Sequence, residues 1–368
     1  MMDSMNQKQN ILSRFQTGQW GAPVFMPDLT LWYKWHKDRN TLPGKYKSCT
    51  MVEITRQLGC PAWNPLRPWR MDHPGVDIVE ERSGTEKVIR YKTPERELTE
   101  RWELAHNGDW WQVEYPVKGT DDLNAALDLA RSRQYELVPD IVSDLSTEKE
   151  KDQVVILELP MQPYADLLHN FLGWSDGLML LLGPGKILLS EIMALMEEKR
   201  LNILEEIAAL PGDLAFAADN LDGQYISPPI FKDHLQKSYE KTAEICRTHG
   251  KKLMVHMGGP GKHLFPLLAQ AGVDGVQGVS GPPQSNATLE EARSLSGPDV
   301  TLWGGIPQDL LIPAHSESDL KRSVQEAVTH AGQDKRMIIG IADRVPVDCD
   351  FSRLQTVIRL VAEAADLS

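Results

Sequence analysis

Short apolar runs alternate with amphipathic stretches through the second half of the chain. Most runs are bounded by Gly, Pro or Asp and are apolar at nearly every position. Continuous hydrophobicity is typical of strands buried on both faces, as in a parallel sheet. One further run near the N-terminus has the same character. The expected strands are Val24–Pro27, Val154–Leu159, Leu214–Ala218, Leu253–His256, Gly275–Val279, Thr301–Gly304 and Met337–Ile341.

Helical patterns separate these runs, and several end in Gly, a common helix stop. They read SEIMALMEEKRLNILEEIAAL, PIFKDHLQKSYEKTAEICRTHG, HLFPLLAQAG, LEEARSLSG and ESDLKRSVQEAVTHAG. Unbroken strand–helix alternation indicates a parallel sheet, and this many units favours a closed barrel over an open sheet. The predicted fold is therefore α/β, a single (β/α)8 TIM barrel domain over residues 1–368.

The N-terminal part has a different pattern. VDIVEERSGTEKVIRYKTP alternates apolar and polar residues around Ser83 and Gly84, which predicts a β-hairpin. Trp110 to Tyr115 could add a strand. Residues 75–117 are therefore expected to form a small antiparallel insertion on the barrel.

Eight of the ten tryptophans lie in the first 111 residues. They could pack this insertion, or they could form an aromatic wall around an apolar ligand. Several of them closely follow predicted strand ends. The eight are Trp20, Trp32, Trp35, Trp63, Trp69, Trp102, Trp110 and Trp111.

Composition and net charge argue against several classes of protein. The 368 residues are 41% hydrophobic and 25% charged, with a net charge of −13. This charge argues against binding to nucleic acid or an anionic membrane. No apolar stretch has the length of a membrane span, and the N-terminus lacks a signal-peptide pattern. The widely spaced Cys49, Cys60, Cys246 and Cys349 fit a reduced, cytoplasmic protein.

Ionisable side chains follow most of the expected strands. In a parallel barrel the functional groups gather at the C-terminal ends of the strands. A single Asp after a strand is often only a turn former or helix cap, and a single His is often a packing residue. So many at one rim predict a site instead, because burying unpaired charge is costly. The rim residues are Asp28, Glu158, Asp219, Asp222, His256, Trp303, Asp343 and Arg344.

Glycines surround the histidine in KLMVHMGGPGKHLF. Gly258, Gly259 and Gly261 would let the chain turn tightly and let a ligand approach the backbone.

Two long segments resemble the uroporphyrinogen decarboxylase superfamily. They are DNLDGQYISPPIFKDHLQKSYEKTAEICRTHGKKLMVHMGG and the later series GVDGVQGVSGPP, VTLWGGIPQDLL and IIGIADRVPVDCDFSRLQTVI. The resemblance covers roughly residues 150–368. The N-terminal TPERELTERWELAHNGDWWQVEYPVKGTDDLNAAL is similar to the branch that includes corrinoid-dependent methyltransferases.

Two departures from the family patterns separate its branches. The Arg-rich segment that holds substrate carboxylates in the porphyrinogen decarboxylases is replaced here by MPDLTLWYKWHKDRN. The zinc thiol-methyltransferases carry His-x-Cys and a later Cys, whereas this chain has His256-Met257-Gly258 and, at the later position, Ala342 or Asp343. The loss of both thiolates argues against a thiol acceptor.

The resemblance implies the demethylase component of a corrinoid-dependent methyltransferase. Such a protein moves a methyl group from a small molecule, here expected to be an O-methyl aromatic ether, to the Co(I) corrinoid (cobalamin) of a partner protein. A metal or a proton donor would stabilise the leaving oxygen. The predicted catalytic residues are His256, Asp219, Asp343 and Glu158, and a zinc ion is expected on His256, Asp219 and Asp343. Substrate contacts are predicted for Asp28, Trp32, Trp35, Tyr225, Trp303 and Arg344.

Two other functions stay open at this stage. One is a decarboxylase-like lyase acting on another carboxylated substrate, and the other is a non-catalytic member of the superfamily. The direction of methyl transfer and the oligomeric state, including a homodimer, are open as well. The clearest structural expectation is that His256 points into the barrel mouth, within reach of Asp219, Asp343 or Glu158.

Overall fold

The computed structural model describes residues 6–16, 22–105 and 110–366, which divide into two compact units. The first contains Met1–Arg67, Asp140–Leu159 and Ala208–Ser368, and the second contains Pro68–Pro139 and Pro160–Ile207. Every predicted site residue belongs to the first unit.

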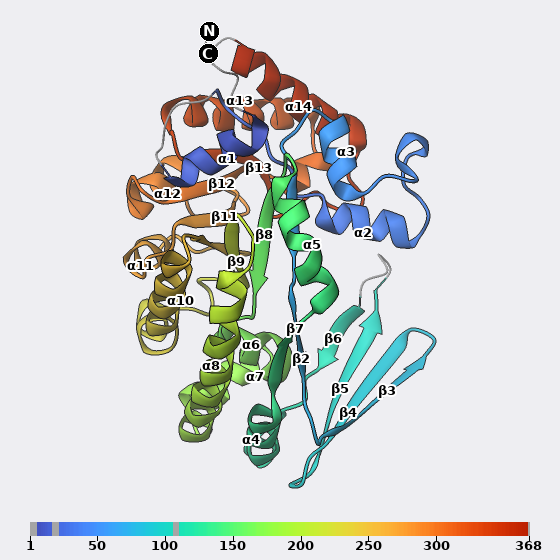
Figure 1. Ribbon diagram of the computed structural model, residues 1–368, viewed down its shortest axis with the longest axis vertical. Helices are drawn as coiled ribbons and strands as arrows, with labels where there is room; N and C mark the ends of the chain where they lie inside the picture. The colour runs from blue at the N-terminus through green and yellow to red at the C-terminus, as the bar shows by residue number, and fades with distance from the viewer. Residues whose placement is uncertain (1–5, 17–21, 106–109, 367–368) are drawn as a thin grey trace. The chain divides into compact units, whose positions relative to one another are not determined.

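A curled parallel sheet forms the centre of the first unit (Figure 1). Its seven strands have the order β1–β8–β9–β10–β11–β12–β13. All six strands predicted from Val154 onward are confirmed, with small extensions. The segment predicted as the first strand makes one parallel bridge, from Phe25 to Ile339 of β13. The strands are β1 (Trp63–Leu66), β8 (Val154–Leu159), β9 (Leu214–Leu221), β10 (Lys252–Met257), β11 (Gly275–Val279), β12 (Thr301–Pro307) and β13 (Met337–Ala342).

Helices connect these strands and begin at residues suited to helix starts. The side chain of Thr288 accepts from the backbone of Glu291 in a capping box at the start of α12, and Ser316 caps α13. The helices are α1 (Gln7–Gln16), α2 (Thr30–Asp38), α3 (Met51–Gln57), α5 (Pro139–Glu150), α9 (Pro228–Ile230), α10 (Gln236–Thr248), α11 (Leu264–Gln270), α12 (Leu289–Ser296), α13 (Glu317–Gln333) and α14 (Phe351–Asp366). Short 3₁₀ helices are η1 (Gly44–Tyr46) and η5 (Gln308–Leu311), and η4 (Phe231–Leu235) is a π-helix.

One face of the sheet encloses an apolar interior. Trp63 on β1 and Trp303 on β12 lie nearly at opposite ends of the strand order, yet their ring centroids are 4.9 Å apart. The sheet must therefore curl strongly to bring its ends together. The same interior holds Phe216, whose ring meets Trp63 edge-on at 6.1 Å. The outer face packs against helices, where Trp32 of α2 stacks on Phe351 of α14.

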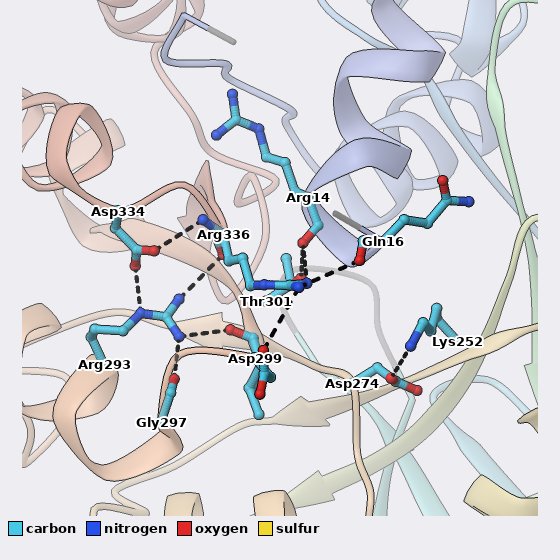
Figure 2. Close-up of polar contacts among 11 residues, drawn as sticks. Arg14, Gln16, Lys252, Asp274, Arg293, Gly297, Asp299, Thr301, Asp334 and Arg336 are labelled. Carbon is cyan, nitrogen blue, oxygen red and sulfur yellow. Dashed lines mark hydrogen bonds and ion pairs between the residues drawn. The ribbon is translucent and has the colours of Figure 1, made fainter. Parts of the chain in front are cut away.

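Helix α1 packs where the strands begin, and arginines join it to the sheet. The Arg336 guanidinium donates to the carbonyl oxygens of Arg14 (2.9 Å) and Gln16 (3.4 Å). Figure 2 shows these bonds beside Arg293, which donates to Asp334 (2.7 Å) and to the Gly297 carbonyl (2.7 Å). The guanidinium groups thus satisfy backbone carbonyls at the N-terminal face, a structural role that leaves the opposite face for chemistry.

The second unit contains the predicted antiparallel insertion. Strands β3 to β6 form a four-stranded antiparallel sheet, and β2 pairs with β7 (Figure 1). The strands are β2 (Trp69–Asp72), β3 (Asp77–Ser83), β4 (Glu86–Lys92), β5 (Glu97–Leu104), β6 (Trp110–Glu114) and β7 (Gln134–Leu137). The helical elements are η2 (Thr120–Asp122), α4 (Leu123–Ser132), α6 (Pro163–Asp166), η3 (Leu167–Leu172), α7 (Trp174–Leu182) and α8 (Lys186–Ala209).

No single helix within the described ranges is long and apolar enough to cross a membrane. By length and composition α7 and α8 pass such a test only as a pair, and they are bent by 108°.

Candidate active site at the C-terminal ends of the strands

His256 lies in β10 beside an irregularity in strand pairing. Val255 pairs with Ala217 of β9, but Met257 pairs with Leu221, so three residues of β9 lie opposite the single His256. A second irregularity follows Gln277, where β11 pairs with β12. Such bulges bend a strand and re-aim its side chains, and they are frequent next to active sites.

Gln277 connects His256 to Asp343. Its side-chain nitrogen donates to the backbone oxygen of Asp343 (3.1 Å), and its side-chain oxygen faces His256 Nδ1 in a hydrogen bond. A carbonyl can only accept, so the Asp343 contact determines which end of the amide faces the imidazole. Because the amide oxygen also only accepts, Nδ1 must carry the proton of this hydrogen bond.

The other imidazole nitrogen faces the Asp343 carboxylate. His256 Nε2 lies 3.1 Å from Asp343 Oδ1. Burial lowers the pKa of His256 below its ordinary value, although Asp343 and Gln277 offset part of this effect. The imidazole and the carboxylate thus face each other at ion-pair distance, although Asp343 Oδ1 has no hydrogen-bond partner among the described residues. The prediction that His256 lies within reach of one of three carboxylates is confirmed for Asp343.

Asp28 is the second buried carboxyl at this rim. Burial raises its pKa to about 6, opposed by hydrogen bonds from Thr30 and by the charge of Arg344. Its Oδ1 accepts from the Thr30 backbone nitrogen (2.9 Å) and hydroxyl (2.5 Å). Its backbone oxygen accepts from Val345 (3.0 Å), which ties the segment of Phe25 to the end of β13.

Arg344 and Glu158 also lie at strand ends. The Arg344 guanidinium is 3.5 Å from Asp343 Oδ2, and its side chain is 43% exposed. At the end of β8, burial raises the pKa of Glu158, and the positive charge of Arg67 offsets part of that shift. Both therefore remain candidates for substrate contact or proton transfer.

Asp219 and Tyr225 are placed differently from His256. The Asp219 carboxylate is buried and accepts a hydrogen bond from the Tyr239 hydroxyl of α10 at 2.5 Å. Tyr225 is half-buried in the turn after β9, where its backbone nitrogen donates to the Asp222 carbonyl (3.1 Å). The structure thus places Asp343 against His256, whereas the Asp219 carboxylate accepts a hydrogen bond from a residue of α10. The catalytic role of Asp219 and the substrate role of Tyr225 remain predictions.

The tryptophans predicted as substrate contacts are engaged in packing. Trp32 is buried among helices of the outer core, and Trp35 carries the Arg39 guanidinium 4.4 Å above its ring. Trp303 is buried in the interior and donates from Nε1 to the Met26 carbonyl (2.9 Å). Trp303 pairs in register with Gln277, which in turn pairs with His256, so the three residues lie at the same level along their strands. Trp20 lies outside the described residues.

The glycines after His256 are explained by close packing of the loop after β10 against the end of β9. A Cβ atom on Gly258 would lie 1.6 Å from Asn220 Oδ1, and one on Gly259 would lie 2.4 Å from the Asp222 carboxyl. A Cβ on Gly261 would lie 2.6 Å from the sulfur of Met257. This packing accounts for the glycines without a ligand.

The donor atoms do not assemble into the predicted three-ligand metal site. Among the residues that the structure describes, no three His, Cys, Asp or Glu side chains are grouped so that they could hold a metal ion. His256 and Asp343 supply two donors, whereas catalytic zinc sites take three protein ligands. The zinc ion therefore stays a prediction.

Three polar residues near the site were not singled out by sequence reasoning: Gln277, Arg67 and Asn220. Gln277 carried a readable signal, because it is the one side chain with hydrogen-bonding groups inside the apolar run Gly275–Val279. Arg67 and Asn220 carried none, since their positions depend on where β1 and β9 end.

Comparison with known families agrees with this architecture. Residues 187–364 match the uroporphyrinogen decarboxylase (URO-D) family model, which confirms the resemblance for this part of the chain. No match was found among curated protein sequences.

Two solved structures are similar to this chain to different degrees. A methyltransferase from Methanosarcina mazei is 14% identical over 99% of both chains, with a TM-score of 0.62. A glycoside hydrolase family 5 enzyme from Prevotella bryantii is 13% identical over 62% of this chain and 77% of its own, with a TM-score of 0.39. At these identities the first likeness shows a shared fold.

Proposed function

We propose that this chain is a methyltransferase that transfers a methyl group from a small molecule to a corrinoid on a partner protein. The match of residues 187–364 to the uroporphyrinogen decarboxylase family model supports the proposal. The expected donor is an O-methyl aromatic ether. The observation that carries the proposal is the close approach of His256 Nε2 to Asp343 Oδ1 (3.1 Å), with Gln277 holding the imidazole at the C-terminal ends of the strands. The fold shared with the M. mazei methyltransferase supports it.

The chemical task of this chain is to protonate a leaving oxygen. When bound, the corrinoid of the partner supplies the nucleophile that accepts the methyl group. The carbon–oxygen bond breaks, and its electron pair stays on the oxygen of the former ether. His256, beside the Asp343 carboxylate, delivers a proton to that oxygen from Nε2, and Gln277 holds the imidazole in place through Nδ1. Asp28, with a pKa of about 6, is a second proton source at the same rim.

The test is methyl transfer from methoxybenzene derivatives to Co(I) cobalamin, followed by the absorbance change of the cobalt. We expect His256→Gln and Asp343→Asn to lower kcat by about 10²- to 10⁴-fold, the usual contribution of a positioned acid. The exposed His315→Gln serves as the matched control and should retain the wild-type rate. Equal rates in the His256 variant and wild type, or no transfer from any methylated donor, would overturn the proposal.

A lyase reaction on a carboxylated substrate is the second candidate. Two arginines, Arg67 and Arg344, follow strands β1 and β13 at this rim and could bind a carboxylate. Release of carbon dioxide from a substrate, without methyl transfer, would favour it.

Two further expectations belong to the proposal. We propose that the segment around Phe25, already bridged to β13, completes a closed eight-stranded barrel. We also propose a cytoplasmic location, because all four cysteines are free thiols.

A further inference from the structure

The strand beside His256 contains a backbone conformation that side chains rarely adopt. Among the described residues, only Asn40 and Asn220 combine a side chain with a positive φ, at 54° and 49°. Asn40 follows α2, and the Asn40 and Thr41 backbone nitrogens donate to carbonyls of its last turn (3.1 and 2.8 Å). Its conformation is therefore that of an ordinary helix end. Asn220 lies in β9, where no helix end accounts for it.

The bulge opposite His256 determines where Asn220 lies. Ala218, Asp219 and Asn220 are the three residues of β9 between the pairs Ala217–Val255 and Leu221–Met257. Asp219 is buried and bonded to Tyr239, whereas Asn220 is exposed. The bulge thus presents Asn220 to solvent at the strand end beside His256.

The carboxamide of Asn220 lies over Gly258. A Cβ on that glycine would be 1.6 Å from Asn220 Oδ1, so the amide occupies space that any larger residue at position 258 would need. Within the described part of the chain, no hydrogen bond is formed by this side chain. Its two N–H donors and its oxygen are therefore available to a ligand.

We infer that Asn220 is a specificity-determining residue that hydrogen-bonds an oxygen substituent of the methyl donor, such as a hydroxyl next to the methoxy group. The inference rests on the proposed function. A strained backbone held by the surrounding strands is typical of groups kept in place for a ligand. The available amide and its place beside His256 indicate which ligand atoms it would contact: oxygen atoms close to the reacting ether.

The test compares two probes that differ by one hydroxyl, 2-methoxyphenol and methoxybenzene, on the full chain. Binding is measured by calorimetry, and methyl transfer is measured separately. Wild type should bind 2-methoxyphenol roughly 3- to 10-fold more tightly, the worth of one neutral hydrogen bond. Asn220→Gly should remove this preference and leave the affinity for methoxybenzene unchanged, because glycine adopts the same positive φ without strain.

Two further variants separate the side chain from the backbone. Gly258→Ala keeps Asn220 but pushes its amide aside, so it should also lose the preference. Asn40→Gly changes the other asparagine with a positive φ and should retain the preference for 2-methoxyphenol. Equal or absent binding of both probes by wild type, or a preference retained in Asn220→Gly, overturns the inference. A preference in binding without methyl transfer would instead refute the proposed function, and would leave Asn220 as a residue that recognises an oxygen substituent of a ligand that is not a methyl donor.

Discussion

At the scale of single residues, the buried carboxyl of Asp28 lowers the stability of the folded protein at neutral pH. Its carboxyl is buried, and burial raises its pKa to about 6 from 3.8. The folded state therefore binds this proton more tightly than the unfolded state. The free energy of unfolding should fall as pH rises from about 4 to 6, and the loss should be complete above pH 6.

We expect Asp28→Asn to stabilise the protein at pH 7 to 8 by up to about 3 kcal/mol, since each unit of pKa shift corresponds to about 1.4 kcal/mol. The asparagine oxygen can still accept from Thr30. Urea denaturation across pH measures the effect, which should vanish below pH 4. The exposed Asp38→Asn is the control. A stabilisation that is the same at every pH would show that charge burial is not its cause.

The sequence predicted the site residues unevenly, and side-chain direction explains the difference. His256 was identified because a histidine at the end of an apolar run is unusual, and its contact with Asp343 is confirmed. Asp219 has the same sequence signature, yet it bonds to Tyr239 of α10. A bulge in β9 decides that direction, and bulges are set by tertiary pairing that a single sequence does not display.

At the scale of elements, glycines maintain the pairing of β11 with β12. Gly304 has φ +152°, and a Cβ there would lie 2.1 Å from the backbone oxygen of Val279. That oxygen belongs to the neighbouring strand and cannot move without breaking the register. The pairing of β11 with β12 after Gln277 therefore requires glycine at position 304.

We expect Gly304→Ala to lower the free energy of unfolding by about 3–5 kcal/mol, in the range of severe backbone strain and clash. Gly281→Ala is the matched comparison, because it also has a positive φ (+79°) but no atom within 4 Å of a new Cβ. It should cost only about 1–2 kcal/mol. Similar urea midpoints for the two variants would contradict the role assigned to the Val279 contact.

Elements with strong local patterns were predicted well, and weak ones were missed. The strands from β8 to β13 each contain a mostly apolar run and were all found. Strand β1 has only four residues, WNPL, with a proline that rarely occupies a strand interior. Strand β5 reads ELTERWEL, whose charges conceal its alternation. Both strands exist because neighbouring strands supply hydrogen-bond partners, which local propensity does not report.

At the scale of the whole molecule, the α/β class and the parallel sheet followed from strand–helix alternation, whereas the antiparallel insertion followed from alternating apolar and polar residues. The predicted (β/α)8 barrel corresponds to a curled sheet of seven strands. The tryptophans predicted as substrate contacts are a different case. Trp32 and Trp303 are packing residues of the outer and inner cores, respectively. Large apolar side chains are needed for both purposes, so composition alone does not separate a core from a pocket.

The metal content of the purified chain tests whether the predicted residues bind zinc. The sequence predicts zinc on His256, Asp219 and Asp343, whereas the described residues contain the His256–Asp343 contact but no group of three donors that could hold a metal ion. Two protein ligands bind zinc weakly compared with three, so we expect less than one zinc per chain after dialysis, and activity that survives chelation. Stoichiometric zinc that is lost in His256→Gln and retained in His315→Gln would contradict this expectation. It would mean that Asp219, or another donor, turns towards His256 when the metal binds, and that the leaving oxygen is stabilised by a metal ion rather than by the proton of His256.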